Sequence, residues 1–520
     1  MGVFFLTLIL FLLLKPYVGY VRTGAVAKLF MAVSIGIILA FASYMGITKR
    51  LSKRNIVVFL LMIGYVLRVG VMLASPTSSY QHDVFTGNFD GHEAYAWTVF
   101  ETGKLPATNV YQFYHPPLNA FAQASFMRFM DGLTKLLGGE DIATRFAYGM
   151  PEYLTEYRYY LYSSCQILSV TYSFIVSVVL VKILKTFKFS DKTYLLLAAF
   201  LILFPRNIQF ATSLNNDALA YLGATCALFF ALRWWKQKTL WYILPCAFSI
   251  GLGMMSKLSS ATVAFPIAGI FIYEFVRTLL KKEGSLKLWN MVLQYGLFLL
   301  ICAPLGLWFQ VYAKIRFDQP FGYVFSNLNS KLYTGDHSLF SRFVFTFDIS
   351  EYLGSIFCRP FDQHYNLFAY ALRSSLFGEF SYINGEGFAV LSLIFAYMGI
   401  TLLLIGLIFC LVRFHKTQRK TYSLLPKGNP VPYQDFMFVF LLVQSQALSE
   451  IFFYAKMPYA CTMDFRYIMP MILGIALTFG YTQKSLAASG SSFALKINEL
   501  LNLALVGLIV STSLFYCIAV

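Results

Sequence analysis

The chain has 520 residues, of which 58% are hydrophobic and only 12% are charged, and its mean hydropathy is +0.64. A soluble protein carries about a quarter charged residues, because polar groups must cover its surface. The composition therefore excludes a set of soluble domains and predicts a multi-spanning membrane protein. A formal charge of +17 would favour nucleic-acid binding in a soluble chain. Here the basic residues are interpreted first as markers of topology, and no nucleic-acid partner is expected.

Thirteen apolar runs approach the length that crosses a bilayer. They occupy residues 3–15, 24–47, 56–74, 160–182, 193–205, 218–235, 240–256, 261–280, 289–313, 387–412, 436–455, 467–483 and 500–519. A spanning helix needs about 20 apolar residues, and the first and fifth runs are shorter, so about 11 to 13 spans are expected. The first run lacks a basic leader and a small-residue cleavage site, which predicts a retained span. The predicted fold is an all-α, polytopic transmembrane helix bundle.

Basic residues gather in four short connectors between these runs. They are Lys49, Arg50, Lys53, Arg54, Lys182, Lys185, Lys188, Arg277, Lys281, Lys282, Arg413, Lys416, Arg419 and Lys420. Short basic connectors face the cytoplasm in most membrane proteins. One alternating path through the spans then places the long loops 75–159 and 314–386 on the outer side. Most acidic residues also fall in these two loops, so we expect the polar chemistry on the outer face.

The first long loop contains a predicted interfacial helix. Apolar residues recur there near helical spacing, at Leu118, Phe121, Phe126, Met127, Met130, Leu133 and Leu137. Such a pattern is typical of a helix that lies at the membrane surface with one apolar side. Pro117 suits the first turn of this helix.

Five ionisable residues stand within a dozen positions at the start of the same loop, directly after the third predicted span. They are His82, Asp83, Asp90, His92 and Glu93. One interpretation is an ordinary solvated loop. Another is a divalent-metal site, because carboxylates and imidazoles can hold such an ion, although the spacing matches no recognised ligand motif. The third is a catalytic cluster.

Eight cysteines stand singly, without the spacing of a metal or redox module. Only Cys358 and Cys461 fall in polar stretches, and a disulfide between them is kept as an alternative.

Several short segments carry a resemblance to a known family. HDV at residues 82–84 is followed by QFYHPPLN at 112–119, SLNNDALAYL at 213–222, KLSS at 257–260, RSSLFGEF at 373–380 and DFRYIMP at 464–470. In this order they resemble the GT-C superfamily of integral-membrane glycosyltransferases. The resemblance is strongest to the family 39-like branch, which includes protein O-mannosyltransferases and the aminoarabinose transferase of lipid A. It covers roughly residues 56–480.

The resemblance implies three parts along the chain. Residues 1–55 are extra N-terminal spans, residues 56–484 form the GT-C-like catalytic module, and residues 485–520 hold a C-terminal span. It also implies transfer of a sugar from a polyprenyl-phosphate donor to an acceptor outside the membrane, with no cofactor strictly required and a divalent metal as an open alternative. A bacterial cell membrane with an outward-facing site is the preferred location, and an endoplasmic-reticulum membrane is the alternative.

The expected chemistry assigns roles to particular residues. A hydroxyl acceptor is a poor nucleophile at neutral pH, so a carboxylate that takes its proton would assist the attack. Asp83 is the predicted base because it lies nearest the end of the third span, and Asp90 and Glu93 are alternatives. The departing phosphate gains negative charge, which predicts cations beside it.

The candidate cations all stand at outer span ends. Lys257 and Arg466 lie within the matching segments and are predicted to bind the donor phosphate. Arg206 is a further candidate, but for Arg206 and Lys456 we prefer extension of the side chain to the lipid headgroups.

Other residues are predicted to contact the substrates or to serve the fold. The substrate-binding candidates are His82, His92, Tyr114, His115, Glu379 and Tyr467. Asn216 or Asp217 is interpreted as a helix cap. Glu274 and Glu450 lie inside spans, where each is either structural or faces a cavity, and Arg68 is a candidate partner for one of them.

Two alternatives to a glycosyltransferase stay open. A secondary transporter or lipid-linked sugar flippase would place its binding groups near the middle of the bilayer and commonly shows two similar halves. A catalytically silent scaffold of the same fold is the other. The sugar, the acceptor and the length of the lipid chain do not follow from the sequence.

Overall fold

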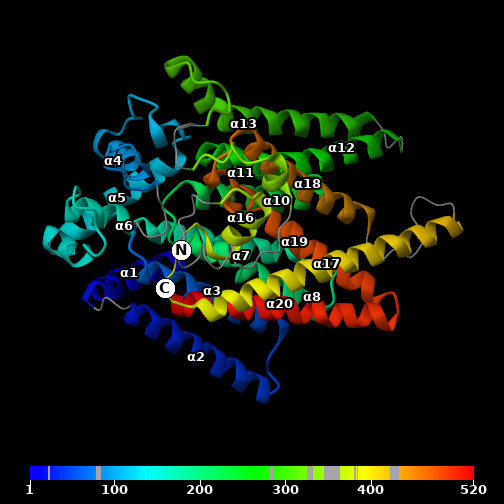
Figure 1. Cartoon of the computed structure of the whole chain (residues 1–520). Coiled ribbons are helices and arrows are strands. Elements are labelled where there is room, and N and C mark those ends of the chain that lie inside the picture. The colour runs from blue at the N-terminus through cyan, green and yellow to red at the C-terminus, as the bar shows by residue number, and fades with distance from the viewer. Residues whose placement is uncertain are drawn as a thin grey trace.

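The computed structural model describes residues 1–20, 24–77, 83–137, 139–280, 285–324, 332–344, 364–379, 382, 384–421 and 432–519. Over these ranges the chain forms helices and no strand. Most of the long helices run side by side along one direction (Figure 1). The predicted all-α helix bundle is therefore confirmed.

Nine helices in the described ranges are long and apolar enough to cross a membrane. They are α2 (Ala25–Ile47), α3 (Lys53–Ala74), α6 (Glu156–Ser164) continued by α7 (Gln166–Leu184), α10 (Asp217–Lys236), η3 (Leu258–Val263) continued by α12 (Ala264–Leu280), α13 (Ser285–Phe317), α17 (Glu386–Thr421), α18 (Tyr433–Lys456) and α20 (Ser492–Ala519). A tenth candidate is broken, since Ala460–Ile468 meets α19 (Met471–Ala487) at a bend of 60°. The chain is thus a multi-pass membrane protein.

Three of the predicted runs form helices that are not among these candidates. They are α1 (Gly2–Tyr20), α8 (Asp191–Ile202) and α11 (Leu240–Ser256). A helix rises about 1.5 Å per residue, so the 12 residues of α8 cover only part of the bilayer. By length and composition, nine or ten helices of the described chain therefore qualify as spans, and these three shorter helices occupy the remaining predicted runs.

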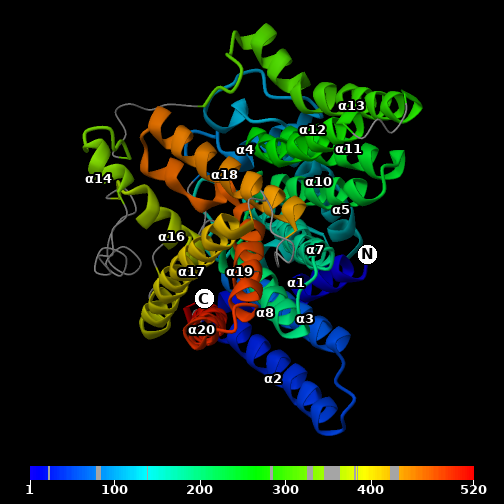
Figure 2. The same cartoon turned by 90° about the vertical axis from the view of Figure 1, so that its right-hand side faces the viewer.

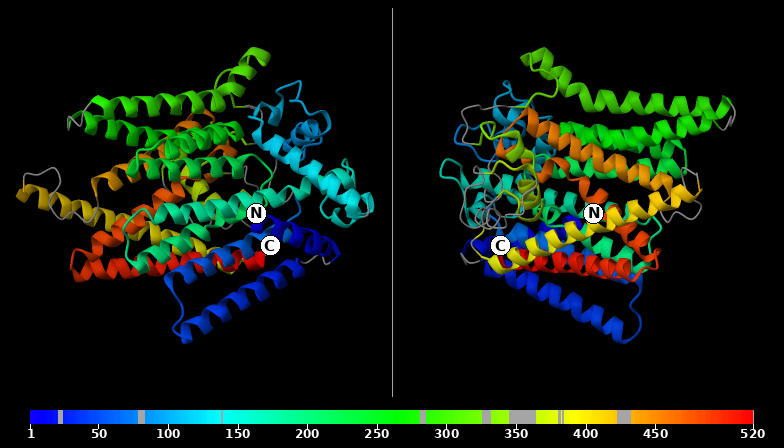
Figure 3. Two further views of the ribbon diagram at one scale, coloured as in Figure 1. Left: turned by 180° about the vertical axis from the view of Figure 1, so that it is seen from behind. Right: turned by 45° about the vertical axis from the view of Figure 1, so that its right-hand side comes forward.

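The two long loops meet at one end of the bundle. The first contains α4 (His92–Thr102), η1 (Tyr111–Tyr114), α5 (Leu118–Leu137) and η2 (Glu140–Phe146), and the second contains α14 (Leu339–Phe343) and α16 (Leu367–Phe377). The helices of the first loop extend beyond one end of the long helices, as the left view of Figure 3 shows. Residues of both loops line one cavity at this end, as expected if both lie on the same side of the membrane.

Basic connectors gather at the other end. Lys53, the first residue of α3, pairs with Asp191 at the start of α8, with 2.5 Å between Nζ and Oδ1. Lys484 at the end of α19 donates to the carbonyl oxygen of Lys188, 3.4 Å away, in the α7–α8 connector. The separation of basic connectors from long loops thus agrees with the predicted topology.

The helix predicted in the first long loop is present as α5. At the start of this helix, the carbonyl oxygen of Pro117 accepts a hydrogen bond from Phe121 N at 3.0 Å. Met127 and Met130 are fully buried in the cluster that α4 and α6 complete, whereas Phe129 stays exposed on the opposite side. α5 therefore anchors the loop helices to the bundle.

Close packing of α10 on α11 brings the side chains of Asp217 and Lys257 together. Gly223 on α10 faces Gly253 on α11, and a Cβ on Gly223 would lie 2.7 Å from the Cα of Gly253. Two glycines let the helices approach closely. Asp217 begins α10 and Lys257 directly follows α11, so this contact places the two side chains next to each other.

Two spans carry buried ionisable groups that serve packing. Arg68 on α3 donates to Ser173 Oγ and Ser177 Oγ on α7, each at 2.7 Å, so the predicted pairing with Glu274 or Glu450 is wrong. Glu274 instead pairs with Lys238 at 3.1 Å and with Arg277 at 3.3 Å.

The terminal spans differ in how they pack. α20 lies along α17, whereas α2 projects from the bundle and contacts it mainly through α3 (Figure 2).

Cys461 is a free thiol, and Cys358, its proposed disulfide partner, lies outside the described residues.

Candidate functional site

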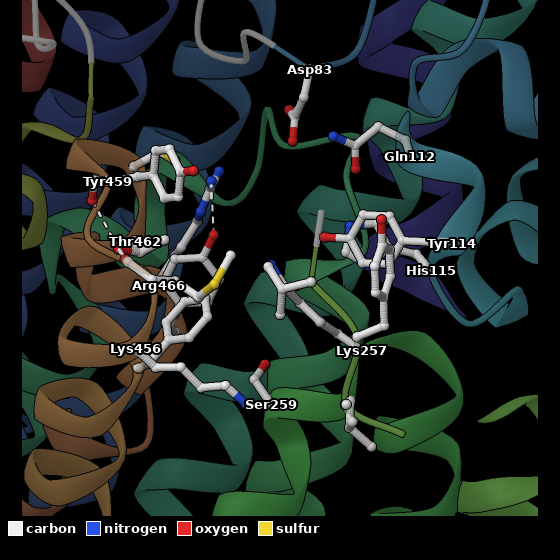
Figure 4. A pocket seen from close by; sticks show the side chains of 18 of the residues that line it. Asp83, Gln112, Tyr114, His115, Lys257, Ser259, Lys456, Tyr459, Thr462 and Arg466 are labelled. Carbon is white, nitrogen blue, oxygen red and sulfur yellow. Dashed lines mark hydrogen bonds between the residues drawn. The ribbon is translucent and has the colours of Figure 1, made fainter. Parts of the chain in front are cut away.

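A cavity of about 730 Å³ lies where the two long loops meet the bundle. Its lining includes Asp83, His92 and His115 from the first loop, Glu379 from the second, and Lys257 and Arg466 from the ends of spans. In Figure 4 the Asp83 carboxylate points into the open space, while Lys257 and Arg466 lie across it. Asp83 with His92 and His115 forms one side of the site, called the acid wall. Lys257 and Arg466 form the other side, called the basic wall.

The backbone at the start of α4 holds Asp83 in place. His92 N donates to the carbonyl oxygen of Asp83 and Glu93 N to that of Val84, both at 3.0 Å. Gly91 makes this close return of the chain feasible, because a Cβ there would lie 2.4 Å from the Val84 carbonyl oxygen. The loop that carries Asp83 is therefore closed onto the N-terminus of a helix.

The Asp83 carboxylate is only partly paired. Its Oδ2 lies 3.5 Å from His92 Nε2, and its buried Oδ1 has no hydrogen-bond partner. Burial by itself would raise the pKa of Asp83, but the nearby His92, Arg466 and Lys257 together hold that pKa well below its usual value. Asp83 is thus ionised at neutral pH, and it lines the cavity with one carboxylate oxygen that has no hydrogen-bond partner.

Aromatic and imidazole rings support the acid wall. The His92 and His115 rings stack with centroids 5.5 Å apart, and Tyr114 lies 4.1 Å from His115. Burial lowers the pKa of His115, and the adjacent His92 and Lys257 lower it further, so its ring is neutral. Tyr111, at the start of η1, has a φ of 42°, a strained backbone of the kind that is common at functional sites.

The basic wall is built around Asp217. Lys257 Nζ lies 2.5 Å from Asp217 Oδ1, and Arg466 Nε lies 3.8 Å from Oδ2 of the same carboxylate. The ring of Tyr467 supports both cations, with its centroid 4.6 Å from Lys257 Nζ and 5.2 Å from Arg466 Cζ. Each cation is largely buried, with 11% and 12% of its side chain exposed.

Further acidic and basic side chains surround Arg466. Its Nη1 is 3.2 Å from Glu379 Oε1. Asp464 accepts a hydrogen bond from Arg466 N at 2.8 Å and pairs with Arg206 at 2.7 Å. Burial and the adjacent Asp464 raise the pKa of Glu379 above its usual value.

Three of the predicted site residues do not line the cavity. Asp90 accepts from Thr86 Oγ1 at 2.6 Å and closes its own turn. Glu93 forms a bidentate pair with Arg158, at 2.6 and 2.8 Å. Arg206 is 5% exposed and pairs with Asp464, so the preferred interpretation that it extends to the lipid headgroups is wrong.

The other predicted residues lie at the cavity, with one exception. Asp83, His92, Tyr114, His115, Lys257, Glu379, Arg466 and Tyr467 all line it. His82 lies outside the described residues.

One face of α18 lines the cavity, and the sequence had pointed only to Glu450 and Lys456 on it. Ser449, Phe453 and Lys456 recur at helical spacing and all face it. Glu450 also lines the cavity, and its Oε1 has no hydrogen-bond partner. The helical spacing of these polar groups near the end of an apolar span is the signal that could have identified this face.

The described part of the chain holds no cluster of three or more His, Cys, Asp or Glu side chains that could bind a metal ion.

The fold and the cavity define a helical multi-pass membrane protein with a charged site at one end of the bundle. The model of the dolichyl-phosphate-mannose-protein mannosyltransferase family matches residues 161–308, which run from α6 to α13. This match confirms the resemblance to GT-C-type membrane glycosyltransferases. It includes Asp217 and Lys257 and leaves Asp83 outside. No curated protein is detectably similar to the chain.

Proposed function

We propose that the protein transfers a sugar from a polyprenyl-phosphate-linked donor to an acceptor hydroxyl at the outer membrane surface. One observation carries the proposal. Asp83, with a free carboxylate oxygen, faces Lys257 and Arg466 across one cavity at the loop end of a membrane-spanning bundle.

The acid wall supplies the base in this reaction. Asp83 accepts the proton of the acceptor hydroxyl as its oxygen bonds to the anomeric carbon, which works best when the carboxylate lies within hydrogen-bond reach. The bond between that carbon and the phosphate oxygen breaks, and the phosphate leaves with the electron pair. Attack from the face opposite the phosphate inverts the configuration, which agrees with a base and cations on opposite walls.

The basic wall stabilises the leaving group. A phosphodiester carries one negative charge, and the departing phosphate carries more, so cations beside it bind the transition state better than the ground state. Lys257 and Arg466 are partly shielded from water, and their charges therefore act over a short distance with little screening. We propose that these two cations, rather than a divalent ion, neutralise the phosphate.

The topology supports an outward-facing site. The basic connectors, which favour the cytoplasm, lie at the end opposite the cavity. A donor held in the bilayer by its lipid chain would then present its phosphate to a cavity at the membrane surface. A bacterial cell membrane is the location that we propose.

The Asp83→Asn variant tests the proposal. We expect sugar transfer to fall by about 10²–10⁴-fold, because the amide cannot take the proton. The assay uses detergent-solubilised protein, a radiolabelled polyprenyl-phosphate sugar, and lipids and glycans from cells that lack the protein as the acceptor pool. Asp141→Asn, a matched change at an exposed aspartate of the same loop, should leave transfer unchanged.

Two outcomes would contradict the proposal. Wild-type turnover in purified Asp83→Asn would show that Asp83 is not the base. Movement of radiolabel across sealed vesicles, without any transfer in detergent, would instead indicate a transporter or flippase.

A further inference from the structure

Arg466 is held between two carboxylates in the resting structure. Asp217 lies 3.8 Å from its Nε and Glu379 lies 3.2 Å from its Nη1. Lys257 is also paired, with Asp217 at 2.5 Å. A phosphate that binds to this wall must therefore take the place of a carboxylate that is already present.

The two carboxylates differ in how firmly they are held. Asp217 contacts both cations and lies in the first turn of α10, where the helix dipole stabilises a negative charge. Glu379 follows α16 and has one ion-pair partner at the cavity, Arg466. Glu379 is therefore the carboxylate that a phosphate displaces more readily.

A protonated Glu379 also has a hydrogen-bond acceptor beside it. Its carboxyl group and that of Asp464 are close enough to act on each other electrostatically, and the Asp464 charge is held by Arg206 at 2.7 Å. A protonated Glu379 can donate to Asp464, whereas two ionised carboxylates in this contact repel each other. The neutral form of Glu379 thus keeps a partner when it releases Arg466.

We propose that Glu379 is a positioning residue that pairs with Arg466 in the empty cavity and releases it to the donor phosphate by taking up one proton. This inference deepens the proposed function and rests on it. It adds a link between proton uptake and binding of a lipid phosphodiester. By linkage, the phosphodiester favours protonated Glu379 as strongly as protonated Glu379 favours the phosphodiester.

Other charged groups surround Glu379 and define the alternatives. Arg206, Arg373, Glu450, Asp464 and Arg466 act on it or on its neighbours electrostatically. Across the cavity stand Asp83 and the imidazoles of His92 and His115. Either imidazole is a second acceptor for a proton when an anion binds, so the experiment must separate them from Glu379.

The direction of the pH effect follows from the raised pKa of Glu379. Below that pKa the carboxyl is neutral, Arg466 is available and donor affinity is highest. As pH rises through it, Glu379 ionises and competes for Arg466, so affinity falls, by up to about tenfold per pH unit for one linked proton. Asp83 stays ionised throughout, so the chemical step keeps its base.

The experiment measures proton uptake on binding of a short-chain polyprenyl methyl phosphodiester, which has no titrating group near neutral pH. Calorimetry in buffers of different ionisation enthalpy, between about pH 6 and about pH 9, gives the number of protons taken up. We expect close to one proton per ligand at the alkaline end for wild type and close to none for Glu379→Gln. The affinity of Glu379→Gln should vary little with pH, and Glu101→Gln, at an exposed position of α4, should behave as wild type.

Each result decides the inference. Wild-type binding without proton uptake would overturn it without any variant, even where sugar transfer by the same preparation upholds the proposed function. Uptake that persists in Glu379→Gln would assign the proton to His92 or His115 and would overturn it as well. Absence of phosphodiester binding by wild type would overturn both proposals together.

Discussion

The two walls of the cavity are prepared in different ways. On the acid wall, Asp83 is ionised and has one carboxylate oxygen without a hydrogen-bond partner. On the opposite wall, Lys257 and Arg466 are already neutralised by Asp217 and Glu379. The base is therefore ready before the substrates arrive, whereas the cations become available only when a phosphate exchanges with a carboxylate.

This difference has a physical reason. Removing a cation from water without a partner is costly, and a buried pair offsets part of that cost. A single carboxylate at the cavity edge needs less compensation, because 21% of the Asp83 side chain remains exposed. The basic wall is more deeply buried and must be neutral at rest, whereas the acid wall can keep its charge.

The largest effect is expected from breaking the basic wall at Arg466. In Arg466→Met, kcat/KM for the donor should fall by about 10²–10³-fold, as when one preorganised donor to a developing anion is removed. The variant also leaves Glu379 and Asp217 short of a partner, which lowers stability. Steady-state kinetics and thermal unfolding measure the two effects separately.

A double variant separates the role of Arg466 in binding from its role in folding. Arg466→Met combined with Glu379→Gln removes both charges of one pair and should regain most of the lost stability. Donor use should stay low, because the cation is still missing. Recovery of activity together with stability would show that Arg466 serves only the fold.

A smaller effect on catalysis is expected from the ion pair outside the cavity. Arg158 holds Glu93 at the start of α4 through two short contacts, and neither residue lines the cavity. Arg158→Met should lower the free energy of unfolding by about 3 kcal/mol, since it leaves a buried carboxylate alone. The KM for the donor should hold within a factor of about two. Denaturant unfolding and kinetics on the same preparation measure both, and a large rise in KM would place this pair in the donor site.

How much of the site was predictable depends on the range of the contacts that form it. The third span ends beside Asp83, and α4 returns to it within nine residues, so local patterns were enough to find Asp83 and His92. The same patterns could not separate Asp83 from Glu93. That choice depends on Arg158, 65 residues away from Glu93.

Long-range pairs account for the wrong interpretations. Arg206 follows the fifth apolar run of the sequence, and extension to the headgroups is the usual behaviour of a cation at such a boundary. Its actual partner is Asp464, 258 residues further along the chain, and no local pattern predicts such a pair. The helix bundle was predictable from hydropathy, but the lengths of the helices in the shorter apolar runs were not, because helix length depends on where the chain turns, as between α8 and α9 (Pro205–Gln209).

The smallest effect is expected at Lys456, the cation that sharpens the contrast between the walls. It is exposed at the end of α18 and lines the cavity, and none of the ion pairs in the described chain includes it. A charge in contact with water is screened and contributes little to a pairing energy. Lys456→Met should therefore raise the donor KM by only about two- to fivefold, with kcat unchanged, and Lys104→Met, at an exposed position of the first loop, should have no effect. A loss at Lys456 as large as at Arg466 would mean that the unpaired cation, and not the paired one, receives the phosphate.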